Sequence, residues 1–136
     1  MRYIFITKSF KGQLKKFKRY FREKDIVLDV KDFVIHGLRK GETYLKKQEI
    51  WSIQLETVKL RVCFHPTKFR YLIGIINDKY FLPIIIDKKT GKHGKNLSLK
   101  ASKATTDAIK SASLNVVLDY IAYKKDKTRA TVYGVE

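Results

Sequence analysis

The segment from Ile50 to Ile86 constrains the fold most, because it is rich in β-branched and aromatic residues in alternating or continuous apolar runs. The runs are separated by the turn signals His65-Pro66-Thr67 and Asn77-Asp78, and strands bounded in this way are typical of an antiparallel sheet. Pro83 in the last run has no N–H to donate to a ladder, which favours a sheet edge or a bulge. The segment therefore predicts the sheet of the domain.

The N-terminal part predicts a strand followed by two helices. Residues 2–7 alternate like a strand, and Ser9 is predicted to cap a basic amphipathic helix that runs through residue 22. Asp25 is the predicted N-cap of a second helix ending near Gly37. We expect the two helices to pack as an antiparallel hairpin. Residues 39–48 are polar and aperiodic, which predicts a connection.

The C-terminal part predicts a loop, a helix and strand-like residues. KKTGKHGKN, residues 88–96, has no apolar anchor and predicts an exposed loop. Residues 101–123 carry a broken apolar stripe at helical spacing, and the last residues are strand-like. A chain of 136 residues fits one domain. We expect an α+β fold, 1–136, with the hairpin on one face of a small, mainly antiparallel sheet and residues 99–136 as a C-terminal helical extension.

The aromatic and sulfur residues predict buried positions rather than a reactive or metal site. Trp51 and Phe64 are expected in the core, and Cys63 is expected to be a small buried residue of a strand. The single cysteine can form no internal disulfide, and the three histidines share no short spacing. These features favour a protein without metal in a reducing cytoplasm.

The charge balance predicts a polyanionic partner. Thirty Lys and Arg face thirteen Asp and Glu, which leaves a formal charge of +17. RNA, DNA and an anionic membrane all match that charge. No apolar run approaches the roughly 20 residues of a membrane span, and the N-terminus lacks the pattern of a signal peptide. Aromatic residues between the lysines and arginines favour RNA, since aromatic rings stack on unpaired bases.

Motifs for metal binding, for an activated serine and for nucleotide phosphates are absent from the sequence. Cationic side chains remain as the candidates for catalysis. Metal-free RNA cleavage needs a base for the 2′-hydroxyl, a cation for the pentavalent phosphorus and an acid for the leaving oxygen. Arg, Lys, His and Tyr supply these roles, and lysines that lie close together lower one another's pKa.

The order of elements and the segment VKLRVCFHPTKFRYLIGIINDKYFLPIIIDKKTGKHGKN resemble the RelE/ParE toxin superfamily over residues 2–98. The resemblance matches Lys59 and Arg61 to the basic pair of one strand and Phe69-Arg70 to the aromatic-arginine pair of the next. It implies that Arg70 stabilises the transition state, although a second register would give that role to Arg61. The remaining implied residues are Lys89 and His93 as acid or base, and Lys68, Lys88, Lys92 and Lys95 as RNA-binding lysines.

The resemblance implies a toxin of a toxin-antitoxin pair that cleaves mRNA, on the ribosome, without a metal or cofactor. It also implies an acidic antitoxin that covers a concave basic face of the sheet opposite the helices. Family members with a catalytic tyrosine carry it in a C-terminal helix, where this chain has Tyr120 and Tyr123. Two alternatives stay open: a ParE-like inhibitor of DNA gyrase, and a basic module that binds nucleic acid without cleaving it.

Overall fold

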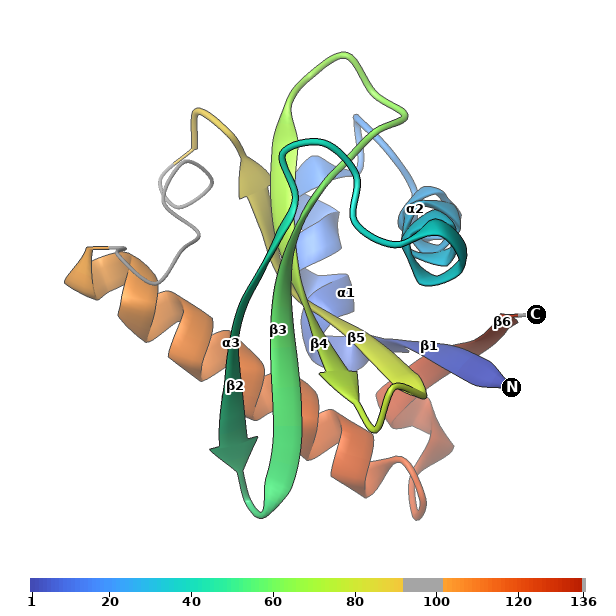
Figure 1. The fold of residues 1–136 in the computed structure, drawn as a ribbon. Helices are drawn as coiled ribbons and strands as arrows, with labels where there is room; N and C mark the ends of the chain where they lie inside the picture. The colour runs from blue at the N-terminus through green and yellow to red at the C-terminus, as the bar shows by residue number, and fades with distance from the viewer. Residues whose placement is uncertain (92–101, 136) are drawn as a thin grey trace.

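The computed structural model describes residues 1–91 and 102–135. Within these residues six strands form one mixed sheet in the order β2-β3-β4-β5-β1-β6 (Figure 1). Only β1 and β5 among them pair in parallel. The strands are β1 (Arg2–Thr7), β2 (Thr43–Ile50), β3 (Ile53–Arg61), β4 (Phe69–Ile76), β5 (Tyr80–Lys88) and β6 (Ala130–Val135). The helices are α1 (Lys8–Leu14), α2 (Glu23–His36) and α3 (Lys103–Ala122), with short 3-10 turns η1 (Lys15–Phe17) and η3 (Lys127–Arg129). The predicted α+β class and N-terminal strand are confirmed.

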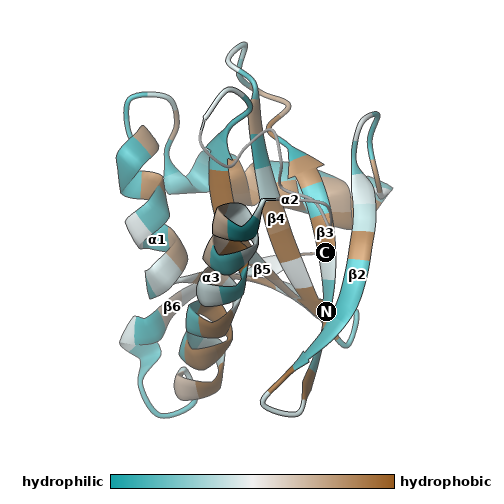
Figure 2. Cartoon of the chain, turned by 90° about the vertical axis from the view of Figure 1, so that its left-hand side faces the viewer, coloured by the Kyte–Doolittle hydropathy of each residue, from teal (hydrophilic) through white to brown (hydrophobic). Residues whose placement is uncertain are grey.

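Helices cover both faces of the sheet. On one face α1 and α2 bury an apolar cluster that includes Phe10, Val30 and Phe69. On the other face α3 buries a second cluster with Val116 and Val117 at its centre. Figure 1 shows α3 lying across this face, and Figure 2 shows the apolar middle strands between the more polar outer elements. The expectation that this whole face is open and basic is therefore wrong, because α3 covers its apolar middle.

The two N-terminal helices differ from the prediction in their bounds. Thr7, not Ser9, caps α1, since its hydroxyl accepts the Phe10 N–H at 3.2 Å. The α-helix ends at Leu14 rather than residue 22 and continues only as η1. Asp25 lies in the first turn of α2, not at its N-cap, and its carboxylate accepts the Arg22 N–H at 2.7 Å.

The expected antiparallel helical hairpin is not confirmed. The main contacts of α1 are with β1, β5 and α3, whereas those of α2 are with β1 and β6. The end of α2 agrees with the prediction, because Gly37 takes φ +82° and donates its N–H to the Phe33 carbonyl. Each helix is thus positioned by the sheet rather than by the other helix.

The polar residues expected to form a connection form β2, an exposed edge strand paired with β3. The turn between them places Trp51 and Ser52 at positive φ, and Trp51 is 54% exposed. Its expected place in the core is wrong. Asn77 and Asp78 also have positive φ, as their turn signal predicts.

Two further expected core residues are exposed because β3 ends earlier than predicted. Cys63 and Phe64 follow the strand in the loop to β4, and both are exposed, although the Phe64 ring contacts Phe21. The turn prediction around His65 is confirmed, since its imidazole Nδ1 accepts the Thr67 N–H at 3.0 Å.

Pro83 lies at a bulge, as predicted. Along β5, Ile85 pairs with Leu72 and Pro83 pairs with Ile73, so Ile84 is the extra residue. Beyond Phe81, the strand β1 no longer pairs with β5. There the Gln13 side chain donates to the Ile84 carbonyl at 2.7 Å and accepts the Ile86 N–H at 3.0 Å. The Gln13 side chain thus satisfies β5 backbone groups that a neighbouring strand would otherwise pair with.

The C-terminal residues complete the sheet. The predicted helix is present as α3, capped by Ser102, whose hydroxyl accepts the Thr105 N–H at 3.3 Å. The strand-like tail is present as β6, which pairs antiparallel with β1 from Arg2↔Val135 to Thr7↔Ala130. Both ends of the described chain therefore meet on neighbouring strands (Figure 1).

Candidate functional site

Strand register brings three of the predicted catalytic residues onto one face of the sheet. Arg61 and Arg70 are direct partners on β3 and β4, and Lys59 lies opposite Leu72. Leu72 belongs to the apolar cluster under α3, so these cations share the face that α3 partly covers. They lie toward the end of that face where β3 and β5 end and β4 begins. We call Lys59, Arg61, Arg70 and Lys89 the basic cluster.

Members of the basic cluster repel one another. The pKa of Lys59 is lowered first by burial and then by the charges of Arg70 and Lys89. The pKa of Arg70 is lowered by burial and by the charge of Arg61. Among the described residues, no member of the cluster forms a salt bridge. The pKa of Lys59 is thus lowered mainly by burial, and the nearby cations add to that effect.

The two arginines of the cluster differ in how firmly they are held. Arg61 donates to the Lys40 carbonyl at 2.6 Å, and its side chain packs against Gly41, where a Cβ would lie only 3.1 Å from it. Within the described residues, the Arg70 side chain makes one hydrogen bond, to the adjacent Phe69 carbonyl at 3.2 Å. Each guanidinium thus uses one N–H in contacts among the described residues, and Arg70 is the less constrained of the two because it is held only by its own neighbour's carbonyl. The two registers left open by the resemblance lead to the same cluster.

The other predicted RNA-binding residues are dispersed. Lys88 lies on the opposite face from the cluster, because it pairs with Phe69 and donates to the Tyr20 hydroxyl. Its ammonium lies 4.5 Å from the centre of the Tyr20 ring. Lys68 is exposed, and its carbonyl accepts the Lys89 N–H at 2.8 Å, which places it beside the cluster. Lys92, His93 and Lys95 lie outside the described residues.

Asp87 is a site residue that the sequence reasoning missed. It is the partner of Arg70 on β5, so its carboxylate lies on the same face as the basic cluster. Its Oδ1 accepts the Lys88 N–H at 2.8 Å, and the carboxylate packs closely against Gly91. The only available signal was its position at the end of an apolar strand.

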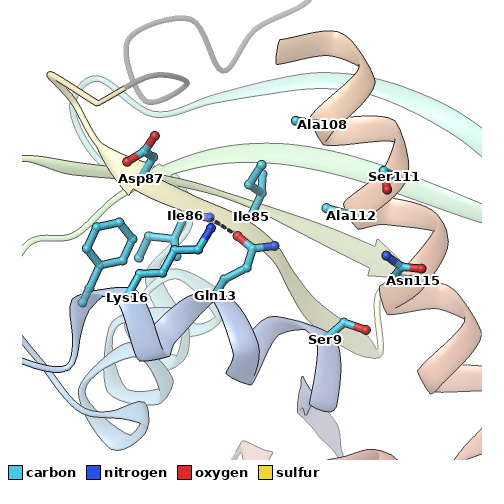
Figure 3. A pocket seen from close by; sticks show the side chains of 11 residues that line it. Ser9, Gln13, Lys16, Ile85, Ile86, Asp87, Ala108, Ser111, Ala112 and Asn115 are labelled. Carbon is cyan, nitrogen blue, oxygen red and sulfur yellow. Dashed lines mark hydrogen bonds between the residues drawn. The ribbon is translucent and has the colours of Figure 1, made fainter. Parts of the chain in front are cut away.

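Asp87 also borders a groove of about 420 Å³ between α1, β5 and α3. Gln13 of α1 and Lys16 of η1 line it on one side, whereas Ser111 and Asn115 line it from α3 (Figure 3). The groove exists because β1 leaves β5 at this point. It gives an extended ligand a path from the cluster along β5.

A second cavity, of about 290 Å³, adjoins the cluster from the other side. It lies between β2, β3, β4 and α3, and Lys46 and Lys110 contribute to its lining. Thr57, on the same face two residues before Lys59, also lines it. Additional cations therefore flank the cluster.

A buried polar network holds the strand end that carries Arg61. Arg39 donates to Asp29 at 2.8 and 3.1 Å and to Glu42 at 2.6 and 2.9 Å. Glu42 in turn accepts the Arg61 N–H at 2.8 Å, and Tyr71 donates its hydroxyl to Asp29. Burial and the Asp29 carboxylate raise the pKa of Tyr71 well above its usual value. These charges are satisfied by one another and serve the scaffold.

Tyr120 and Tyr123 do not join the basic cluster. They contact the Phe5 ring near the start of β5, at the opposite end of that strand from Asp87 and Lys88. The residues that the structure describes also contain no group of His, Cys, Asp and Glu suited to hold a metal ion. In the same residues, no helix is long and apolar enough to cross a membrane.

Comparisons of the chain with protein-family models, with curated proteins and with solved structures returned no match.

Proposed function

We propose that the chain is a metal-independent endoribonuclease that cleaves mRNA, in the manner of a RelE-like toxin acting on the ribosome. The observation that carries the proposal is the basic cluster. Its cations meet on adjacent strands without salt-bridge partners among the described residues. Cations held close together in this way suit a dianionic phosphorus centre, because each contributes more in a partly buried site than in water.

The geometry suggests a division of roles. Lys59 has a lowered pKa, so it is the member of the cluster most easily present as a neutral amine that takes the 2′-hydroxyl proton. The O2′–P bond then forms, and Arg70 stabilises the charge on the non-bridging oxygens. Lys89 as an ammonium donates a proton to the leaving 5′-oxygen as the P–O5′ bond breaks. The products are a 2′,3′-cyclic phosphate and a free 5′-hydroxyl.

The proposal extends to a partner. A toxin with this surface needs an acidic antitoxin, and the basic cluster with its flanking lysines is the surface that fits one. In the described part of the chain α3 covers the apolar middle of this sheet face, so the proposed place for such a partner is the end of the face. An antitoxin segment would therefore lie over β3, β4 and the end of β5 rather than across the whole sheet.

The experiment expresses the wild type, Arg70→Ala and Arg19→Ala in a translation extract and maps mRNA 5′ ends. Arg19 is an exposed arginine that follows η1 and serves as the matched control. We expect cleavage by the wild type and the control, and a loss of about 100-fold or more with Arg70→Ala, as for removal of one transition-state donor. Cleavage unchanged by Arg70→Ala would remove the assignment, and binding without any cleavage would favour the module that only binds nucleic acid.

A further inference from the structure

A pocket of about 410 Å³ lies at the opposite end of β5 from the basic cluster. Phe5, Tyr80, Tyr120 and Tyr123 form its aromatic walls, and Lys124 and Lys127 line its opening. These residues come from β1, the start of β5, the end of α3 and the turn that follows α3. Its volume is within the roughly 300–1,000 Å³ of small-ligand sites.

The aromatic rings form one connected group. The Phe5 ring meets Tyr80, Tyr120 and Tyr123 edge-on, at centroid distances of 5.7, 5.3 and 5.3 Å. Tyr3 extends the group by stacking on Tyr80 at 6.0 Å. Phe5 is buried, whereas the four tyrosines are only partly buried. Phe5 thus fixes the tyrosines that remain accessible.

The polar atoms of the pocket are available to a ligand. Within residues 1–91 and 102–135, the hydroxyls of Tyr80, Tyr120 and Tyr123 make no hydrogen bond, although Tyr20, Tyr71 and Tyr133 each make one. Burial and the neighbouring Tyr80 raise the pKa of Tyr120, so its hydroxyl stays a proton donor at neutral pH.

Lysines surround the rings. The Lys127 ammonium lies 4.2 Å from the centre of the Tyr123 ring, and Lys79 lies 5.5 Å from that of Tyr80. The nearby Asp126 is already bound by Thr128 and by Arg129 at 3.4 Å, so it leaves Lys124 and Lys127 unneutralised. Flat aromatic faces bordered by amines match a nucleotide, whose base stacks and whose phosphate is anionic.

We infer that this pocket binds one unpaired nucleotide of a single-stranded RNA, with the base against the tyrosines and the phosphate at Lys124 and Lys127. The site is separate from the basic cluster, since the eight steps from Tyr80 to Lys88 along β5 span about 26 Å at a strand's usual rise. RNA binding at this pocket does not depend on RNA cleavage by the basic cluster. An RNA strand bound at both places would be held at two points, one at the C-terminal end of α3 and one where β3 ends and β4 begins.

The test measures binding of a fluorescent 2′-O-methyl RNA of about 12 nucleotides by anisotropy. The methyl group blocks the cleavage nucleophile, so the result does not depend on the proposed nuclease activity. We expect Tyr123→Leu to weaken binding about 5- to 100-fold, and Tyr123→Phe to restore it because the ring is kept. Lys127→Gln should reduce the magnitude of the salt slope by about 0.7, the value for one phosphate contact to a single strand.

Matched controls are Tyr44→Leu, an exposed tyrosine on β2, and Lys31→Gln on α2 over the opposite face. Both control variants should change the dissociation constant for the RNA by less than about twofold. Unchanged binding in both Tyr123→Leu and Lys127→Gln would overturn the inference, and Lys127 is exposed, so its variant folds normally. Equal affinity for a free 5′-mononucleotide would also overturn it, because the site would then not require a strand.

Discussion

At the scale of single residues, position across a strand pair decides what a cation can do. Arg61 and Arg70 are partners with the same chemical group, yet Arg61 is held by the Lys40 carbonyl and Arg70 is bound only to its neighbour's carbonyl. Lys59 receives the repulsion of Arg70 and Lys89. The repulsion within the cluster therefore lowers the free energy of unfolding, by an amount that depends on whether Lys59 is charged.

Lys59→Met should stabilise the folded chain at pH 7. Folding lowers the pKa of Lys59 below its ordinary value of 10.5. At a pH between the folded-state and unfolded-state pKa values, the unfolded chain therefore binds more protons than the folded chain. Below the folded pKa the charged lysine carries the full penalty, which is relieved as pH rises through that pKa. We expect a gain of a few tenths of a kcal/mol at pH 7 that shrinks toward pH 10.5, since solvent screens this partly exposed group.

Urea unfolding of the wild type and Lys59→Met at several pH values measures this gain. Lys31→Met, at a half-buried lysine of α2 away from the basic cluster, is the matched control for replacing a lysine by methionine. A gain for Lys59→Met that grows as pH rises would contradict the expected sign.

The sequence predicted the cations of the site better than their surroundings. The family resemblance grouped Lys59, Arg61 and Arg70, and strand alternation puts Lys59 and Arg61 on one face. Asp29, Arg39 and Glu42 could not be grouped, because their contacts depend on where α2 and β2 pack. Trp51, Cys63 and Phe64 were assigned to the core by residue type, which does not reveal where a strand ends.

At the scale of elements, side chains hydrogen-bond to strand backbone at two places in the described sheet where no neighbouring strand does so. Gln13 bonds the backbone of β5 beyond the end of its pairing with β1. Arg39 and Glu42 join the loop before β2 to the end of β3. Both arrangements hold the strands that bear the basic cluster.

Gln13→Ala should destabilise the chain by about 1–3 kcal/mol, because it leaves the Ile84 carbonyl and the Ile86 N–H without partners in a partly buried place. Gln54→Ala, at an exposed position of β3, is the control. Hydrogen exchange is the direct measurement, and the Ile86 amide should lose protection more than the amides at the start of β5. Equal protection in both variants would contradict the role given to Gln13.

Arg39→Met should cost about 3–5 kcal/mol, because it leaves the buried carboxylates of Asp29 and Glu42 without their cation. The pKa of Arg39 is raised by hydrogen bonds to these carboxylates, which outweigh the opposing effect of burial. Arg19→Met, an exposed arginine, should change the free energy of unfolding by less than about 0.5 kcal/mol. Chemical denaturation compares the two, and a similar small loss in both would show that the network is not stabilising.

Most helices and strands could be predicted from the periodicity of their apolar residues. The strand that was not predicted, β2, shows the limit of that approach. β1, α2, α3 and β6 have apolar residues at strand or helix spacing because each buries one face. β2 is a polar edge strand with only Ile50 fully buried, so its sequence carries no period. The position of α3 on the sheet could not be predicted either, because a helical pattern indicates which face of the helix is buried but not which residues pack against it.

At the scale of the whole molecule, charge and shape act together. The helices bury the apolar middle of both sheet faces, and the chain as a whole carries a formal charge of +17, which creates a strong positive field. Such a field raises the rate of encounter with a polyanion, and it weakens as salt is added. Under the proposed function, the cations where β3 ends and β4 begins are the place where the polyanion is held.

Binding of single-stranded RNA should therefore weaken steeply with salt, and mostly through the basic cluster. If its four cations each contact one phosphate, the logarithm of the binding constant should fall with a slope of about −2.8 against the logarithm of salt concentration from these contacts alone. Converting Lys59, Arg61, Arg70 and Lys89 to glutamine or methionine should remove that part of the slope. A matched quadruple variant at Lys15, Lys18, Arg19 and Lys24, all exposed near α1 and α2, removes the same charge.

Anisotropy titrations with a 2′-O-methyl RNA between about 50 and 300 mM KCl separate the two variants. Loss of four charges lowers the long-range attraction equally in both, so any common decrease reports the net charge of the molecule. The additional loss of slope in the cluster variant reports phosphates held at the strand ends. Equal slopes in the two variants would mean that RNA is bound by overall charge, and that the cations brought together across β3 and β4 do not form a binding site.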